Sequence, residues 1–121
     1  MHMLTRCMRV AIVALFLSLC IMPNLYAQDD AVVIDEAGVF AGRIGEVERA
    51  ANELVKIGAD VRVRTIRTFK PYATLDAYEE NLWKSSPSWR ANDGGRKNNL
   101  VVIIAAINDR KTGIYYGDQW K

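Results

Sequence analysis

The sequence contains few of the residues that most enzyme active sites use. Only one of its 121 residues is histidine and two are cysteine, and these residues, His2, Cys7 and Cys20, all lie near the amino terminus. Without residues 1–27, the remaining chain cannot form a Ser-His-Asp triad, a Cys-His pair, a disulfide, or a zinc site with nitrogen or sulfur ligands. A metal could then be bound only by oxygen, which favours calcium or magnesium.

Residues 1–27 have the pattern of a secretory signal peptide. Arg6 and Arg9 precede an apolar run over residues 10–22, and Ala27 provides the small residue that signal peptidase requires. The run is shorter than the roughly 20 residues that a membrane-spanning helix needs. We therefore expect cleavage after Ala27 and export of the rest of the chain to the periplasm or the extracellular space. An uncleaved signal anchor in the membrane is the alternative.

The exported part, residues 28–121, is expected to form one small domain with no net charge. Removal of Arg6 and Arg9 takes two from the 16 basic residues, which leaves as many as the 14 acidic residues. General attraction to nucleic acid or to an anionic membrane is therefore not supported.

Apolar periodicity predicts the order strand, helix, strand, helix, strand, strand. The expected strands cover residues 31–34, 60–66, 100–107 and 114–117, and the expected helices cover residues 40–54 and 75–86. The run at 100–107 is expected to be a central strand covered on both faces. Crossover helices make the first three strands parallel. The expected fold is a three-layer α/β sandwich with a four-stranded mixed sheet, in which a hairpin strand follows three parallel strands.

Polar side chains follow two of the expected parallel strands. Asp35 comes after the first strand, and Asn108 and Asp109 come after the third. Open α/β folds bind ligands at this edge of the sheet, so Asp35, Asn108 and Asp109 are the predicted ligands of calcium or magnesium. Asp35, Asp109 and Arg110 are the predicted catalytic residues. Arg110 would bind a phosphate or carboxylate, while the metal would polarise a phosphoryl oxygen or activate water.

A purely structural interpretation of these residues stays open. Asp35 has the position of a residue that caps the following helix. Asp109 and Arg110 have the composition of an ordinary turn.

Two further patterns are interpreted as structural. Arginines alternate with apolar residues along the second expected strand, which is typical of an edge strand that avoids pairing with neighbours. These are Arg62, Arg64 and Arg67. The tryptophans are interpreted as core or rim packing and not as a platform for stacking bases. These are Trp83, Trp89 and Trp120.

The order of several short motifs resembles that of the TPM domain family, which includes a thylakoid-lumen acid phosphatase and many exported bacterial proteins. Residues 33–39, Val-Ile-Asp-Glu-Ala-Gly-Val, are similar to the opening motif of the family. Residues 97–99, Lys-Asn-Asn, then Asp109-Arg110-Lys111 and Gly117 resemble its later landmarks in the same order. The sequence departs from the family at Leu100 and at Gly117-Asp118-Gln119, where members usually have glycine and a Gly-Tyr-Gly turn.

The resemblance implies an exported domain whose function belongs to one of two classes. One is a divalent-cation-dependent acid phosphatase that uses no organic cofactor. The other is a non-catalytic calcium-binding or protein-interaction module, an accessory or assembly factor for envelope or membrane proteins. Family members normally continue into further helices that pack on the sheet, so the domain is expected to be incomplete after Lys121.

Overall fold

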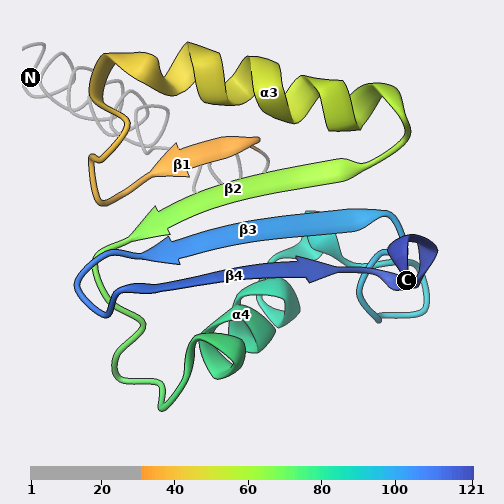
Figure 1. Ribbon diagram of the computed structural model, residues 1–121. Coiled ribbons are helices and arrows are strands. Elements are labelled where there is room, and N and C mark those ends of the chain that lie inside the picture. Colours follow the sequence, from red (N-terminus) through yellow and green to blue (C-terminus); the bar gives the residue numbers. More distant parts are fainter. Residues whose placement is uncertain (1–30) are drawn as a thin grey trace, which may run out of the picture.

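A four-stranded mixed sheet forms the centre of the structure, a computed structural model that describes residues 31–121 (Figure 1). The strands are β1 (Val33–Asp35), β2 (Asp60–Ile66), β3 (Leu100–Ala106) and β4 (Lys111–Tyr116). They lie in the order β1-β2-β3-β4, with the first three parallel and β4 antiparallel to β3. This is the predicted fold class.

The predicted signal peptide, residues 1–27, and its alternative, an uncleaved membrane anchor, lie outside the described residues. Within residues 31–121, no helix has the length and apolar character needed to cross a membrane.

Helix α3 (Ile44–Lys56) packs on one face of the sheet, against β1 and β2. Its apolar side contributes Val47 and Ala51, which pack with Val61 and Val63 of β2. The helix begins four residues later than the predicted start at residue 40, because a 3-10 turn at Ala41–Arg43 comes first. Gly58 follows the helix with φ +98, a left-handed conformation that glycine adopts without steric cost.

Helix α4 (Leu75–Lys84) packs on the opposite face of the sheet. Thr74 caps its amino end, since the Thr74 Oγ1 accepts a hydrogen bond from the Ala77 N–H at 3.1 Å. Leu75 joins the larger core cluster together with Trp89 from the following 3-10 turn (Pro87–Trp89) and with side chains of β3. The two helices and the sheet therefore make three layers.

Strand β3 is central, as predicted, but its two faces are covered unequally. Leu100, Val102, Ile104 and Ala106 are at most 1% exposed and face α4. The alternate residues, among them Ile103, face the α3 side and are only half-buried. The expectation of complete cover on both faces was therefore wrong for the α3 side, because α3 lies over β1 and β2 and leaves β3 beside it.

The hairpin between β3 and β4 is tighter than predicted. The chain turns over residues 107–110, and β4 already begins at Lys111, three residues before the expected start at Ile114. Arg110 has φ +52 and donates its N–H to the Ile107 carbonyl at 3.2 Å. Lys111 and Thr112 pair with Ala106 and Ala105, so polar residues that suggested a loop belong to the strand.

Candidate functional site

The carboxyl ends of the three parallel strands meet at one edge of the sheet, where the sequence predicted a site. Asp35 is the last residue of β1, and its Cα pairs with that of Thr65, which in turn pairs with Ala105. Asp109 lies just beyond the end of β3. The two predicted carboxylates are thus at the same edge of the molecule, on either side of the end of β2.

Asp35 binds groups of its own chain with both carboxylate oxygens. Oδ1 accepts a hydrogen bond from Thr65 Oγ1 at 2.5 Å and from the Val39 N–H at 3.0 Å. Oδ2 accepts one from the Phe40 N–H at 2.9 Å. The Thr65 hydroxyl is the main cause of a lowered pKa of Asp35, which the backbone N–H groups lower further against the opposing effect of burial. Asp35 is therefore an ionised carboxylate that fixes the turn leading to α3.

Asp109 has a similar role after β2. Its Oδ2 accepts hydrogen bonds from Thr68 Oγ1 at 2.9 Å and from the Phe69 N–H at 2.8 Å. The other oxygen, Oδ1, accepts a longer bond from the same hydroxyl at 3.2 Å. Asp109 consequently ties the hairpin between β3 and β4 to the segment that follows β2.

The other two predicted site residues, Asn108 and Arg110, are exposed in the hairpin. The Asn108 N–H donates to the Arg67 carbonyl at 2.8 Å. Since neighbouring strands lie about 4.8 Å apart, the Cα atoms of Asp35 and Ala105 are separated by roughly 10 Å across β2. Within residues 31–121, no three His, Cys, Asp or Glu side chains are grouped so that they could hold a metal ion.

Two threonines at this edge were missed by sequence reasoning. Thr65 is 1% exposed, and its hydroxyl donates to Asp35 and accepts the Ala37 N–H at 3.2 Å. Thr68 makes the corresponding contact with Asp109. Their only signal was the presence of hydroxyl residues at and just after the end of the second expected strand.

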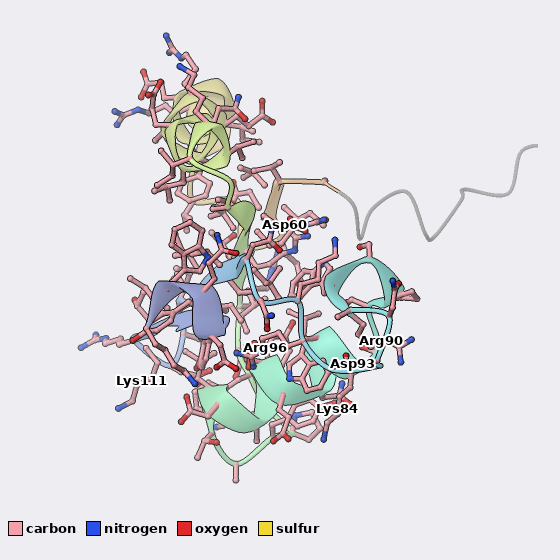
Figure 2. The ribbon with its side chains drawn as sticks, turned by 90° about the vertical axis from the view of Figure 1, so that its right-hand side faces the viewer. Asp60, Lys84, Arg90, Asp93, Arg96 and Lys111 are labelled. Atoms are coloured by element: carbon pink, nitrogen blue, oxygen red, sulfur yellow. The ribbon has the colours of Figure 1, made fainter. Side chains whose placement is uncertain are left out.

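The opposite edge of the sheet, where β2 and β3 begin, holds several charged residues (Figure 2). Asp60 accepts hydrogen bonds from Arg62 Nε at 2.8 Å and from Lys97 Nζ at 3.0 Å. Burial opposes its ionisation, but these two cations outweigh that effect and lower the pKa of Asp60.

A second ion pair joins Arg96 to Glu79, in which Arg96 donates to Glu79 Oε2 at 2.6 Å. Glu79 is 2% exposed, and its Oε1 is one of two buried side-chain atoms within residues 31–121 that lack a hydrogen bond.

The interpretation of the arginines as an edge-strand feature was wrong. β2 lies between β1 and β3, and Arg62 and Arg64 are only 7% and 6% exposed. Their guanidinium groups lie 5.9 and 5.2 Å from the centre of the Trp89 ring, where an aromatic face attracts cations. Arg64 also donates to the carbonyls of Val32 and Ala31 at 3.1 and 2.9 Å. The alternating charges therefore belong to the interior of the domain.

An apolar groove of about 290 Å³ runs between α3 and the sheet. Its floor and walls carry no charged residue. The lining residues are Phe40, Val47, Ala50, Ala51, Leu54, Val61, Val63 and Ile103. Beyond it on the same face, Ile114 and Tyr116 of β4 pair with Ile103 and Val101 of β3 and are 62% and 46% exposed. The open part of this face is thus apolar from α3 to the edge strand.

The family model described as the TPM domain matches residues 33–121. No curated protein and no solved structure matches the chain. The matched residues include all strands of the sheet and both of the helices described above, and with most of its length matched the chain belongs to the TPM domain family.

Proposed function

We propose that this TPM domain works outside the cytoplasm as a non-catalytic interaction module that receives an amphipathic helix of an envelope protein. The helix would lie on the sheet beside α3. The observation that carries the proposal is the uncharged apolar groove between α3 and Ile103, which continues over the exposed side chains of β4. The signal-peptide pattern of residues 1–27 supports the location.

The dimensions of the open face favour a helix as the occupant. α3 packs on β1 and β2, so the strands left beside it on this face are β3 and β4, which together span about 10 Å. An α-helix with its side chains is about 10 Å wide. The seven residues of β3 extend over about 23 Å. Trp120 packs on this face near the start of the strand, so about 15 residues is the upper limit for a helix that fits.

The chemistry of the groove restricts the helix face that enters it. A charged side chain placed against Val47, Leu54 and Ile103 would lose its hydration without gaining a partner, because no polar side chain lines the groove. The contacting face must therefore be apolar, with leucine-like residues at spacings of three and four.

The hydrogen bonds of the two aspartates support a non-catalytic role. Asp35 and Asp109 each accept bonds from a threonine hydroxyl and from backbone N–H groups. A calcium or magnesium ion would need several oxygen ligands, and these carboxylates can supply few, because most of their acceptor sites already hold the loops after β1 and β2. Residues 31–121 contain neither histidine nor cysteine as another nucleophile or base.

The test uses a peptide of about 15 residues containing only leucine, lysine and glutamate, with the leucines on one helical face. A peptide of the same composition with scattered leucines is its control. Fluorescence anisotropy of the labelled peptide is measured against the purified protein. The variants are Leu54→Glu, in the groove, and Val55→Glu, on a neighbouring residue that is 43% exposed and outside it.

We expect saturable binding of the amphipathic peptide to the wild-type and Val55→Glu proteins. Binding to Leu54→Glu should be at least about tenfold weaker, which corresponds to 1.4 kcal/mol, because the new carboxylate would be buried against apolar side chains. Equal binding of both peptides, or unchanged binding to Leu54→Glu, would contradict the proposed docking surface.

The phosphatase alternative is tested in the same preparation. Hydrolysis of a generic phosphomonoester is measured with and without calcium or magnesium for the wild type and for Asp35→Asn and Asp109→Asn. We expect no cation-dependent turnover that either substitution removes. Turnover that both substitutions abolish in folded protein would instead establish a metal-assisted acid phosphatase.

A further inference from the structure

Within residues 31–121, strand β4 has an open edge. β3 is its only neighbour in the sheet formed by this part of the chain. The Gly117 N–H donates to the Leu100 carbonyl at 2.9 Å, so the odd-numbered residues of β4 direct their N–H and C=O groups toward β3. Because these directions alternate along an antiparallel strand, the backbone groups of Thr112, Ile114 and Tyr116 point away from the sheet.

This edge lacks the features that usually prevent pairing with another strand. Native edge strands are typically short or interrupted by proline, bulges or charged side chains. β1, at the opposite edge, has only three residues. β4 has six residues without proline, and Lys111 at its first position is its only charged residue.

The side chains at the open edge are also uncharged. Ile114 and Tyr116 are 62% and 46% exposed, and both lie on the α3 side of the sheet opposite Ile103 and Val101. Thr112 lies on the same side opposite Ala105. The residues whose backbone groups are unpaired therefore carry the uncharged side chains that extend the apolar face to the edge.

We propose that β4 pairs antiparallel with β4 of a second copy of this chain, about a twofold axis at Ile114, to form a continuous eight-stranded sheet. In this register Ile114 lies opposite Ile114 of the partner subunit, and Thr112 lies opposite Tyr116 of the partner subunit. Each outward-facing residue then donates one hydrogen bond and accepts one. The two apolar faces adjoin across the axis.

A second copy fits this edge better than an unrelated strand because the edge is self-complementary. Opposite residues share one face of a sheet, so Ile114 packs on its own equivalent and Tyr116 packs beside Thr112 of the partner subunit. Lys111 falls opposite Gly117 of the partner subunit, next to the partner's Asp118. The single charge of the strand therefore meets an opposite charge and not a like one.

The first test is the mass of the purified protein in solution, measured by light scattering during size-exclusion chromatography. We expect the mass of two chains for the wild type. Ile114→Lys, which places two like charges at the axis, should have the mass of one chain. Ile57→Lys is the control, because Ile57 is as exposed, at 64%, and lies outside β4, and it should stay dimeric. Circular dichroism establishes that both variants are folded.

A second test checks the register. Opposite residues of a hydrogen-bonded pair have Cα atoms about 5.5 Å apart, within the range for a disulfide. Ile114→Cys should therefore form a disulfide-linked dimer under mild oxidation, whereas Ile57→Cys and the wild type should not. Single-chain mass for the wild type would overturn the proposal. So would a dimer that withstands Ile114→Lys but is lost in Leu54→Glu, since that result would place the contact in the groove.

Discussion

The contacts of Trp89 with the core and with two buried arginines give a quantitative prediction about stability. Trp89 is 1% exposed and belongs to the core cluster of Leu100, Val102 and Ile104. Its ring also lies near the guanidinium groups of Arg62 and Arg64. Trp89→Phe keeps an aromatic face for these cations, whereas Trp89→Leu keeps only apolar volume.

The expected costs follow from these contacts. A cation over an aromatic ring contributes about 0.5–2 kcal/mol, with the larger values where water is excluded. Trp89→Leu loses both contacts. In addition to the packing loss that both variants share, this should lower its free energy of unfolding by about 1–4 kcal/mol. A domain of about 90 residues has a free energy of unfolding of roughly 5–14 kcal/mol. The leucine variant should thus fold but be markedly less stable than the phenylalanine variant.

Urea unfolding followed by far-ultraviolet circular dichroism measures this difference. If the slope of the free energy of unfolding against urea concentration is the same for the variants, they expose the same surface on unfolding. The control pair is Trp83→Phe and Trp83→Leu. Trp83 also has two cations near its ring, at 5.8 Å for Lys84 and 5.6 Å for Arg96, but it is only half-buried. The difference in free energy of unfolding between Trp83→Leu and Trp83→Phe should therefore be smaller than that between the two Trp89 variants. Equal stability of the two Trp89 variants would refute the role assigned to the arginines.

Three further predictions concern the carboxylates and one glycine. Burial raises the pKa of Glu79 despite the opposing Arg96 charge, so folding favours the protonated carboxyl group. The contribution of Glu79 to stability is therefore lost as the pH rises from the ordinary pKa of glutamate through the raised pKa of the folded protein. The melting temperature of Glu79→Gln relative to the wild type should therefore be higher at pH 7 than at pH 4, and a constant difference would contradict this. Gly117→Ala should lower the free energy of unfolding by about 1–3 kcal/mol, because a Cβ there would lie 2.3 Å from the Asn98 carbonyl oxygen. Urea unfolding tests this, and an unchanged free energy of unfolding would disprove the close approach. Asp109→Ala should increase hydrogen exchange at the Phe69 amide, whereas exchange at the distant Val47 amide should not change; equal protection at Phe69 in variant and wild type would show that Asp109 does not hold this segment.

Local patterns predicted the helices and the central strand because these elements depend on spacing alone. Residues at intervals of three and four placed Val47 and Ala51 on the buried side of α3. Polar residues at the start of the next periodic segment left Thr74 and Asp76 as candidates near the helix start, and the structure has the cap at Thr74. The apolar run from Leu100 indicated a strand with neighbours on both sides.

Features that depend on distant partners could not be predicted in the same way. Alternation of arginine with valine in β2 shows that one face is charged, but it does not show whether water or an aromatic ring lies against that face. Trp89, which covers Arg62 and Arg64, is more than 20 residues away in the sequence and belongs to another element. Likewise, Thr65 and Thr68 became partners of the two aspartates only through the parallel pairing of the strands.

An aspartate after a parallel strand can organise loops or bind a ligand, and its remaining hydrogen-bonding capacity distinguishes the two roles. An ionised carboxylate has about four acceptor sites, and Asp35 already uses three of them for Thr65, Val39 and Phe40. Asp109 likewise accepts three contacts from the segment after β2. Each carboxylate therefore keeps only one or two free acceptor sites. A cation that took more of them would replace internal hydrogen bonds and loosen the loops after β1 and β2. The apolar face beside α3 has no such conflict, because an apolar helix placed there would displace only water.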